Sequence, residues 1–136
     1  MNNNHEFTLP GKIIFGSGAL ETVGKESSLL GKKCLVVTGQ HSMKRMGFTD
    51  VLAGSLEKKG LEAVIYDKVE EDPSLNTVDK GLEMGRRAGC DLAIGLGGGS
   101  AMDVAKSIAG IFRENTNSIS EFYDGIRIAR YGIPFI

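Results

Sequence analysis

This chain has little of several features that mark specialised protein classes. It contains no tryptophan, only two cysteines, and no apolar run of the about 20 residues that a membrane-spanning helix needs. Its 16 basic and 17 acidic residues leave a formal charge of −1, so no bulk field favours nucleic acid or a membrane surface. We therefore expect a soluble, cytoplasmic domain with neither a nucleic-acid nor a membrane partner.

The residues that hold metals or form disulfides are few and scattered. Cys34 and Cys90 each flank an apolar run, which indicates buried reduced thiols, because one disulfide would be a poor framework for 136 residues. No C-x-x-C or His-x-x-x-His spacing occurs, and His5 and His41 lie far apart. We interpret both histidines as solvated surface residues and expect no metal site within the chain.

Apolar runs alternate with helical patterns along the sequence. Strands are predicted at residues 7–9, 12–15, 33–38, 61–66 and 91–96, and helices at 16–30, 49–59, 75–87, 100–112 and 119–123. This alternation predicts an α/β fold, Rossmann-like and doubly wound, with a mostly parallel sheet and an N-terminal edge strand or hairpin. Residues 133–136 resemble the opening of a further buried strand, so we expect an N-terminal portion of a longer protein.

The most informative segment follows the predicted strand at residues 91–96. Gly97, Gly98 and Gly99 lead there into a predicted helix that opens on Ser100. Glycines let the backbone approach a phosphate, and Ser100 can cap a helix whose free N–H groups attract an anion. Parallel sheets bind ligands at the carboxyl ends of their strands, where this loop lies. The loop therefore predicts a phosphate-bearing ligand.

Three familiar motifs do not fit this loop. The dinucleotide fingerprint G-x-G-x-x-G needs glycine where Ser100 stands, and it follows the first strand of a fold, not a late one. The P-loop needs Gly-Lys-Ser/Thr, and the nucleophile elbow G-x-S-x-G needs a glycine two residues after its serine. What remains is G-G-G-S-x-x-D-x-A-K over residues 97–106.

That string resembles the signature of the iron-containing (group III) alcohol dehydrogenases, within the dehydroquinate-synthase-like superfamily. Residues 10–20, 35–39 and 70–74 resemble further segments of this family, so the likeness extends over essentially the whole chain. The resemblance implies that a dinucleotide pyrophosphate is bound by four residues of the loop, namely Gly97, Gly98, Gly99 and Ser100.

The resemblance also puts Asp103 beside the same pocket. Asp103 and Lys106 are three residues apart on the predicted helix, so they share one face and can form an ion pair. Binding of the cofactor and support of the loop remain alternative roles for Asp103.

The end of the strand at residues 33–38 bears on cofactor choice. Four residues there, Thr38, Gly39, Gln40 and Ser42, are predicted to lie against the cofactor, and Gly39 stands where NAD-preferring members of the family carry Asp. A carboxylate would bind the adenosine ribose and repel a 2′-phosphate. Its absence leaves space for a phosphate near Ser42, Lys44 or Arg45. We predict NADP(H) over NAD(H), with a plain solvated loop and short helix as the alternative for residues 40–45.

The family's chemistry is hydride transfer between a nicotinamide and a small alcohol or aldehyde, with Fe²⁺ or Zn²⁺ as Lewis acid. The resemblance places the metal ligands in a helical C-terminal domain absent from this chain. Residues 1–136 are thus predicted to be the N-terminal NAD(P)-binding domain, without catalytic or metal-binding residues. Alone they should bind a dinucleotide weakly or not at all and should not turn over. The resemblance also implies a homodimer paired through residues 12–15.

Two other functions are also compatible with the sequence. One is a truncated, stand-alone nucleotide-binding module without catalysis, and the other is a polyol dehydrogenase of the same superfamily, against which Ser100 argues modestly. A reading frame that continues into Thr-Thr-x-Gly-Thr-Gly-Ser-Glu would favour the enzyme, and a natural stop codon after residue 136 would favour the module.

Overall fold

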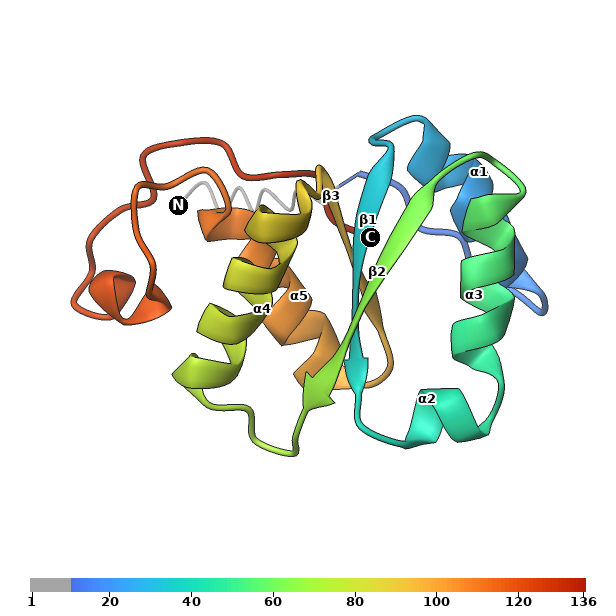
Figure 1. Ribbon diagram of the computed structural model, residues 1–136, viewed down its shortest axis with the longest axis horizontal. Coiled ribbons are helices and arrows are strands. Elements are labelled where there is room, and N and C mark those ends of the chain that lie inside the picture. Colours follow the sequence, from blue (N-terminus) through green and yellow to red (C-terminus); the bar gives the residue numbers. More distant parts are fainter. Residues whose placement is uncertain (1–10) are drawn as a thin grey trace, which may run out of the picture.

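A parallel three-stranded sheet forms the centre of residues 11–136, the part of the chain that the computed structural model describes (Figure 1). β1 (Lys33–Gly39) lies between β2 (Glu62–Val69) and β3 (Leu92–Leu96). Its residues from Cys34 to Thr38 are all buried, as expected for a continuous apolar run covered on both faces. The predicted Rossmann-like α/β fold is confirmed.

The register brings the carboxyl ends of all three strands to one edge. Gly39 pairs with Val69 of β2, and Thr38 pairs with Leu96 of β3. A fourth segment begins beside β3, where Phe135 forms a parallel bridge with Ala93. The last residues thus continue the sheet as the apolar run at residues 133–136 predicts.

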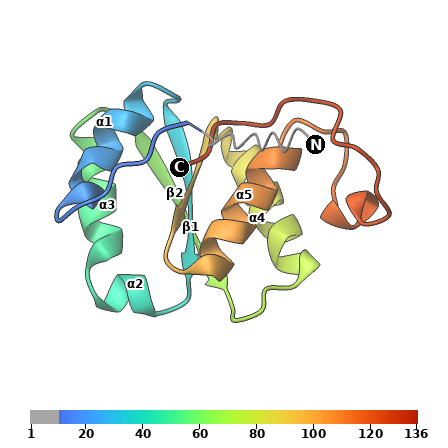
Figure 2. The ribbon, with the colours of Figure 1, turned by 180° about the vertical axis from the view of Figure 1, so that it is seen from behind.

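Helices cover both faces of the sheet (Figures 1 and 2). α4 (Leu75–Ala88) and α5 (Gly99–Ile111) pack on one face, whereas the 3₁₀ helix η1 (Ala19–Thr22), α1 (Val23–Ser28) and α3 (Phe48–Glu57) cover the other. The short α2 (Ser42–Arg45) follows β1, and a 3₁₀ helix, η2 (Ile119–Phe122), lies beyond α5. The apolar core is therefore divided into two layers by the sheet.

The C-terminal end of α5 is fixed by Arg86 of α4. The guanidinium donates hydrogen bonds to four backbone carbonyl oxygens at the end of α5 and in the segment that follows it: Phe112 (2.9 Å), Ile111 (3.0 Å), Glu114 (2.7 Å) and Thr116. Burial lowers the pKa of Arg86 from its ordinary value. This contact anchors α5 at the end remote from the glycine loop.

The N-terminal predictions need two corrections. The helix expected over residues 16–30 begins only at Ala19, because Gly18 takes a left-handed φ of 78°. It consists of the 3₁₀ turn η1 followed by α1, which ends at Ser28. Residues 12–15 form no strand with any described segment; Ile13 and Phe15 are 72% and 100% exposed. A strand requires a ladder partner, which these residues do not find here. The strand expected at residues 7–9 lies outside the described residues.

Candidate functional site

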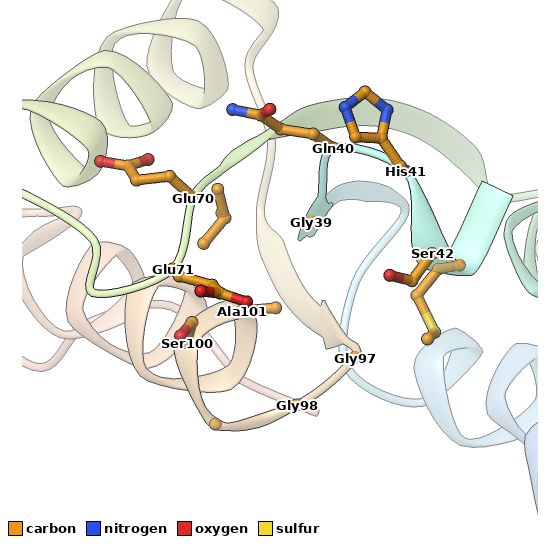
Figure 3. A pocket seen from close by; sticks show the side chains of 13 residues that line it. Gly39, Gln40, His41, Ser42, Glu70, Glu71, Gly97, Gly98, Ser100 and Ala101 are labelled. Atoms are coloured by element: carbon orange, nitrogen blue, oxygen red, sulfur yellow. The ribbon is translucent and has the colours of Figure 1, made fainter. Parts of the chain in front are cut away.

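A cavity of about 400 Å³ opens at the carboxyl edge of the sheet (Figure 3). The segments that follow the three strands converge there because the strands are parallel. Its lining comes from the end of β1 and the residues after it (Gly39, Gln40, His41, Ser42 and Met43), from the end of β2 and the residues after it (Val69, Glu70 and Glu71), and from the residues after β3 (Gly97, Gly98, Gly99, Ser100 and Ala101).

The glycine loop forms one wall as an open backbone surface. Gly97 has a φ of 143°, which side chains rarely adopt, and Gly98 is the N-cap residue of α5. A Cβ added at Gly98 or Gly99 would meet no atom within 4 Å. This space lies at the N-terminus of a 13-residue helix, where unpaired N–H groups and the helix dipole favour an anion. The loop therefore fits a pyrophosphate.

Ser100 does not have the capping role predicted for it. α5 begins one residue earlier, at Gly99, and its N-cap Gly98 makes no side-chain capping bond. An N-cap residue needs extended backbone angles, which Gly98 supplies with φ −82° and ψ −169°. Ser100 is thus inside the first helical turn, half-buried, and lines the cavity.

Asp103 lies one turn further along α5, on its exposed side. Its Oδ1 accepts a hydrogen bond from Lys106 Nζ at 2.7 Å, and both side chains are about two-thirds exposed, 67% and 65%. Asp103 is not among the described residues that line the cavity. The geometry shows the ion pair, and a role for Asp103 in binding the cofactor stays a prediction.

The four residues predicted around the end of β1 occupy two different depths. Gly39, Gln40 and Ser42 line the cavity. Thr38 is 1% exposed beneath them, and its hydroxyl has no hydrogen-bond partner among the described residues. A Cβ added at Gly39 would lie 3.7 Å from the Val69 carbonyl oxygen, an ordinary contact. The position can therefore accept a side chain without rearrangement of the fold.

Two carboxylates on the β2 side of the cavity were not among the predicted site residues. Glu70 Oε1 accepts hydrogen bonds from Thr77 Oγ1 at 2.6 Å and from Ser74 N at 3.1 Å. These contacts lower the pKa of Glu70 to about 2. Glu71 follows it and is exposed. The only sequence signal was the acidic loop at residues 70–74, which carried the family resemblance without indicating that it faces the glycine loop.

Cys34 and Cys90 are both buried and free, as predicted. Burial is the main cause that raises the pKa of each thiol, to about 12 for Cys34. Thiols held in this protonated form are poor nucleophiles, so neither contributes chemistry to the cavity.

The described residues hold no group of three or more His, Cys, Asp or Glu side chains placed to bind a metal ion. His41 is exposed at the cavity, and His5 lies outside the described part of the chain. In residues 11–136 no helix has the length and apolar character needed to cross a membrane.

Comparison with known proteins identifies related chains. A family model described as iron-containing alcohol dehydrogenase matches residues 10–136. The NADPH-dependent butanol dehydrogenase of Clostridium saccharobutylicum is 45% identical over 102 residues, covering 75% of this chain and 26% of the relative. The NADH-dependent butanol dehydrogenase B of Clostridium acetobutylicum is 35% identical over 125 residues, covering 92% of this chain and 32% of the relative.

A solved structure shares the fold. The alcohol dehydrogenase of an archaeal, halo-thermophilic source in a Red Sea brine pool superposes with a TM-score of 0.90 and 36% identity, over 99% of this chain and 36% of that one. This chain thus spans about a quarter to a third of the length of the curated relatives that it matches.

Proposed function

This chain belongs to the iron-containing alcohol dehydrogenase family, and from that premise we propose that it forms the dinucleotide-binding portion of a metal-dependent alcohol dehydrogenase that uses NAD(P)H. The observation that carries the proposal is the open glycine surface at the N-terminus of α5, facing the ends of β1 and β2 across one cavity. The substrate class is a small alcohol or the corresponding aldehyde.

The residues of this chain would bind and orient the cofactor. The backbone of Gly97, Gly98 and Gly99 holds the pyrophosphate against the N–H groups of α5, and the Ser100 hydroxyl lies in the same wall. The segment from Gly39 to Ser42 accommodates the adenosine ribose. When bound, the nicotinamide supplies or accepts the hydride for the alcohol or aldehyde. No residue from 11 to 136 is assigned to a metal ion, because the described side chains offer no ligand set.

The cofactor preference proposed is NADP(H) over NAD(H). Gly39 offers no carboxylate to bind a ribose 2′-hydroxyl, and the space beyond it is open towards Ser42. Lys44 and Arg45 follow Ser42 on α2. The pKa of Asp67 is lowered first by the hydrogen bond from Lys68 and to a smaller extent by the charge of Lys44. Relatives named for either cofactor match the chain.

A homodimer is proposed through residues 12–15. Ile13, Ile14 and Phe15 are 72%, 45% and 100% exposed, an apolar surface that a second copy would cover by strand pairing. Sedimentation velocity tests this, and a monomer at all accessible concentrations would contradict it.

Dinucleotide binding with a substitution in the glycine loop tests the proposed function. Gly98→Asp should keep α5 intact, since aspartate is a favoured N-cap residue and the added Cβ meets no atom within 4 Å. Its carboxylate would occupy the anion site and repel the pyrophosphate, so affinity for NADP⁺ should fall at least about tenfold, or about 1.4 kcal/mol.

The matched control is Gly54→Asp on α3, where a Cβ also meets nothing within 4 Å and the charge change is the same. Titrations followed by NMR suit the weak affinity expected of these residues alone. Equal affinities for Gly98→Asp and the control would contradict a pyrophosphate site at the loop.

A further inference from the structure

The charged side chains that line the cavity are all of one sign. Among its described lining residues, Glu70 and Glu71 are carboxylates and there is no lysine or arginine. The attraction for phosphate therefore comes from backbone N–H groups and the dipole of α5, not from basic side chains. Any anion in the cavity also experiences repulsion from the β2 side.

Glu70 gives this side a permanent negative charge. Its two carboxylate oxygens accept hydrogen bonds from Thr77 Oγ1 at 2.6 and 2.8 Å, and Ser74 N donates a third at 3.1 Å. With a pKa of about 2 it stays ionised at neutral pH, where dinucleotide binding would be measured. Because Glu70 also ties β2 to the start of α4, its replacement would disturb the wall itself.

Glu71 carries the second charge without such ties to α4, as an exposed side chain at the turn. Figure 3 shows both carboxylates on one side of the cavity, across from His41 and Ser42. A volume of about 400 Å³ corresponds to a cube about 7 Å on edge, which is comparable with the Debye length of about 8 Å at physiological salt, so a phosphate on the β2 side of the cavity is only partly screened from Glu71.

We propose that Glu71 is a specificity-determining residue that weakens binding of the phosphorylated ribose of NADP(H) relative to the unphosphorylated ribose of NAD(H). This inference rests on the proposed function of the cavity. The absence of a carboxylate at Gly39 favours NADP(H), whereas the acidic side chain of Glu71 disfavours it. The balance of these two effects sets the cofactor preference. The 2′-phosphate adds about 1.5 to 2 negative charges to the pyrophosphate that both cofactors carry. The Glu71 carboxylate therefore repels NADP(H) more strongly than NAD(H).

The test is the ratio of NADP⁺ to NAD⁺ affinity in a charge series at one position. Glu71→Gln should raise this ratio about twofold to fourfold, and Glu71→Lys about fourfold to fifteenfold, from Coulomb interactions across a solvated cavity. The rise should shrink as ionic strength increases, because screening removes interactions at this range. Glu57→Gln and Glu57→Lys, at the exposed C-terminal end of α3, apply the same charge changes away from the cavity and should leave the ratio unchanged.

The possible outcomes distinguish failure of the role of Glu71 from failure of the proposed function. A ratio that is unchanged across the series, while binding still depends on Gly98, overturns the role of Glu71 and leaves the cofactor site standing. Weaker binding of both cofactors by Glu71→Gln also overturns it, because that result marks a hydrogen-bond acceptor for a group that they share. Dinucleotide binding that Gly98→Asp does not weaken overturns the inference and the proposed function together.

Discussion

Replacement of Gly39 by aspartate should reverse the cofactor preference of this domain. Gly39 ends β1 at the edge of the cavity and has no left-handed φ that would strain a side chain. The new Cβ would lie 3.7 Å from the Val69 carbonyl oxygen, so the fold should accept it. The added carboxylate would stand beside the ribose site, where it can accept a hydrogen bond from a 2′-hydroxyl but repels a 2′-phosphate.

The magnitude follows from the exposure of this site. Two unit charges about 4 Å apart interact by about 1 kcal/mol in water and about 4 kcal/mol at an effective dielectric constant of about 20. The half-exposed setting of Gly39 favours the lower part of that range. We expect NADP⁺ binding to weaken by about 1–2 kcal/mol, or about fivefold to thirtyfold. NAD⁺ should gain up to about tenfold from one hydrogen bond to a charged group.

Parallel NMR titrations with NADP⁺ and NAD⁺ give both affinities for Gly39→Asp and for the unchanged chain. Gly39→Ala is the steric control and should alter the ratio little, since its methyl group makes only an ordinary contact. A Gly39→Asp protein that remains folded with the same ratio of affinities as the unchanged chain would refute the assignment of the ribose site.

Two further predictions concern what holds the site in place. Arg86→Met should lower the free energy of unfolding in urea by about 2–4 kcal/mol, because carbonyls such as those of Phe112 and Glu114 lose a charged donor. Arg86→Lys should recover only part of that stability, and a loss under about 1 kcal/mol for Arg86→Met would contradict the anchor. Because the pKa of Glu70 is lowered from 4.5 to about 2 in the folded state, its ionised carboxylate stabilises the fold fully above pH 4.5. This contribution is lost as the pH falls towards about 2. Between these two pH values, the free energy of unfolding should therefore fall more steeply with decreasing pH for the unchanged chain than for Glu70→Gln. Coincident curves for the two proteins would contradict this role of Glu70.

The sequence allowed most of the sheet and the longer helices to be predicted. β1 is a continuous apolar run, and α4 carries explicit boundaries: Ser74 as N-cap residue and Gly89 with a left-handed φ of 71°. These signals are local, so they survive without knowledge of the tertiary structure. Most of the cavity residues on the β1 and β3 sides were also predictable, because strand ends in a parallel sheet share one edge. His41, Met43 and Ala101 were not among the predicted site residues.

The rest depended on contacts that a sequence does not display. The position of Glu70 and Glu71 at the same cavity as the glycine loop is set by the order β2-β1-β3 and the register between the strands. The role expected of Ser100 as cap was wrong because α5 gains its first turn from Gly99, with Gly98 in the extended conformation. An apolar pattern at residues 12–15 indicated a strand, but strand formation needs a partner that the described chain does not offer them.

We infer that the glycine loop at the start of α5 binds the phosphates of a nicotinamide dinucleotide. The most direct measurement is the change of backbone amide chemical shifts in ¹⁵N-labelled protein on titration with NADP⁺. The structure predicts the largest changes at Gly97, Gly98, Gly99 and Ser100, with a second group from Gly39 to Ser42. Changes confined to residues elsewhere, such as the groove between Asn76 and Asn117, would contradict this assignment.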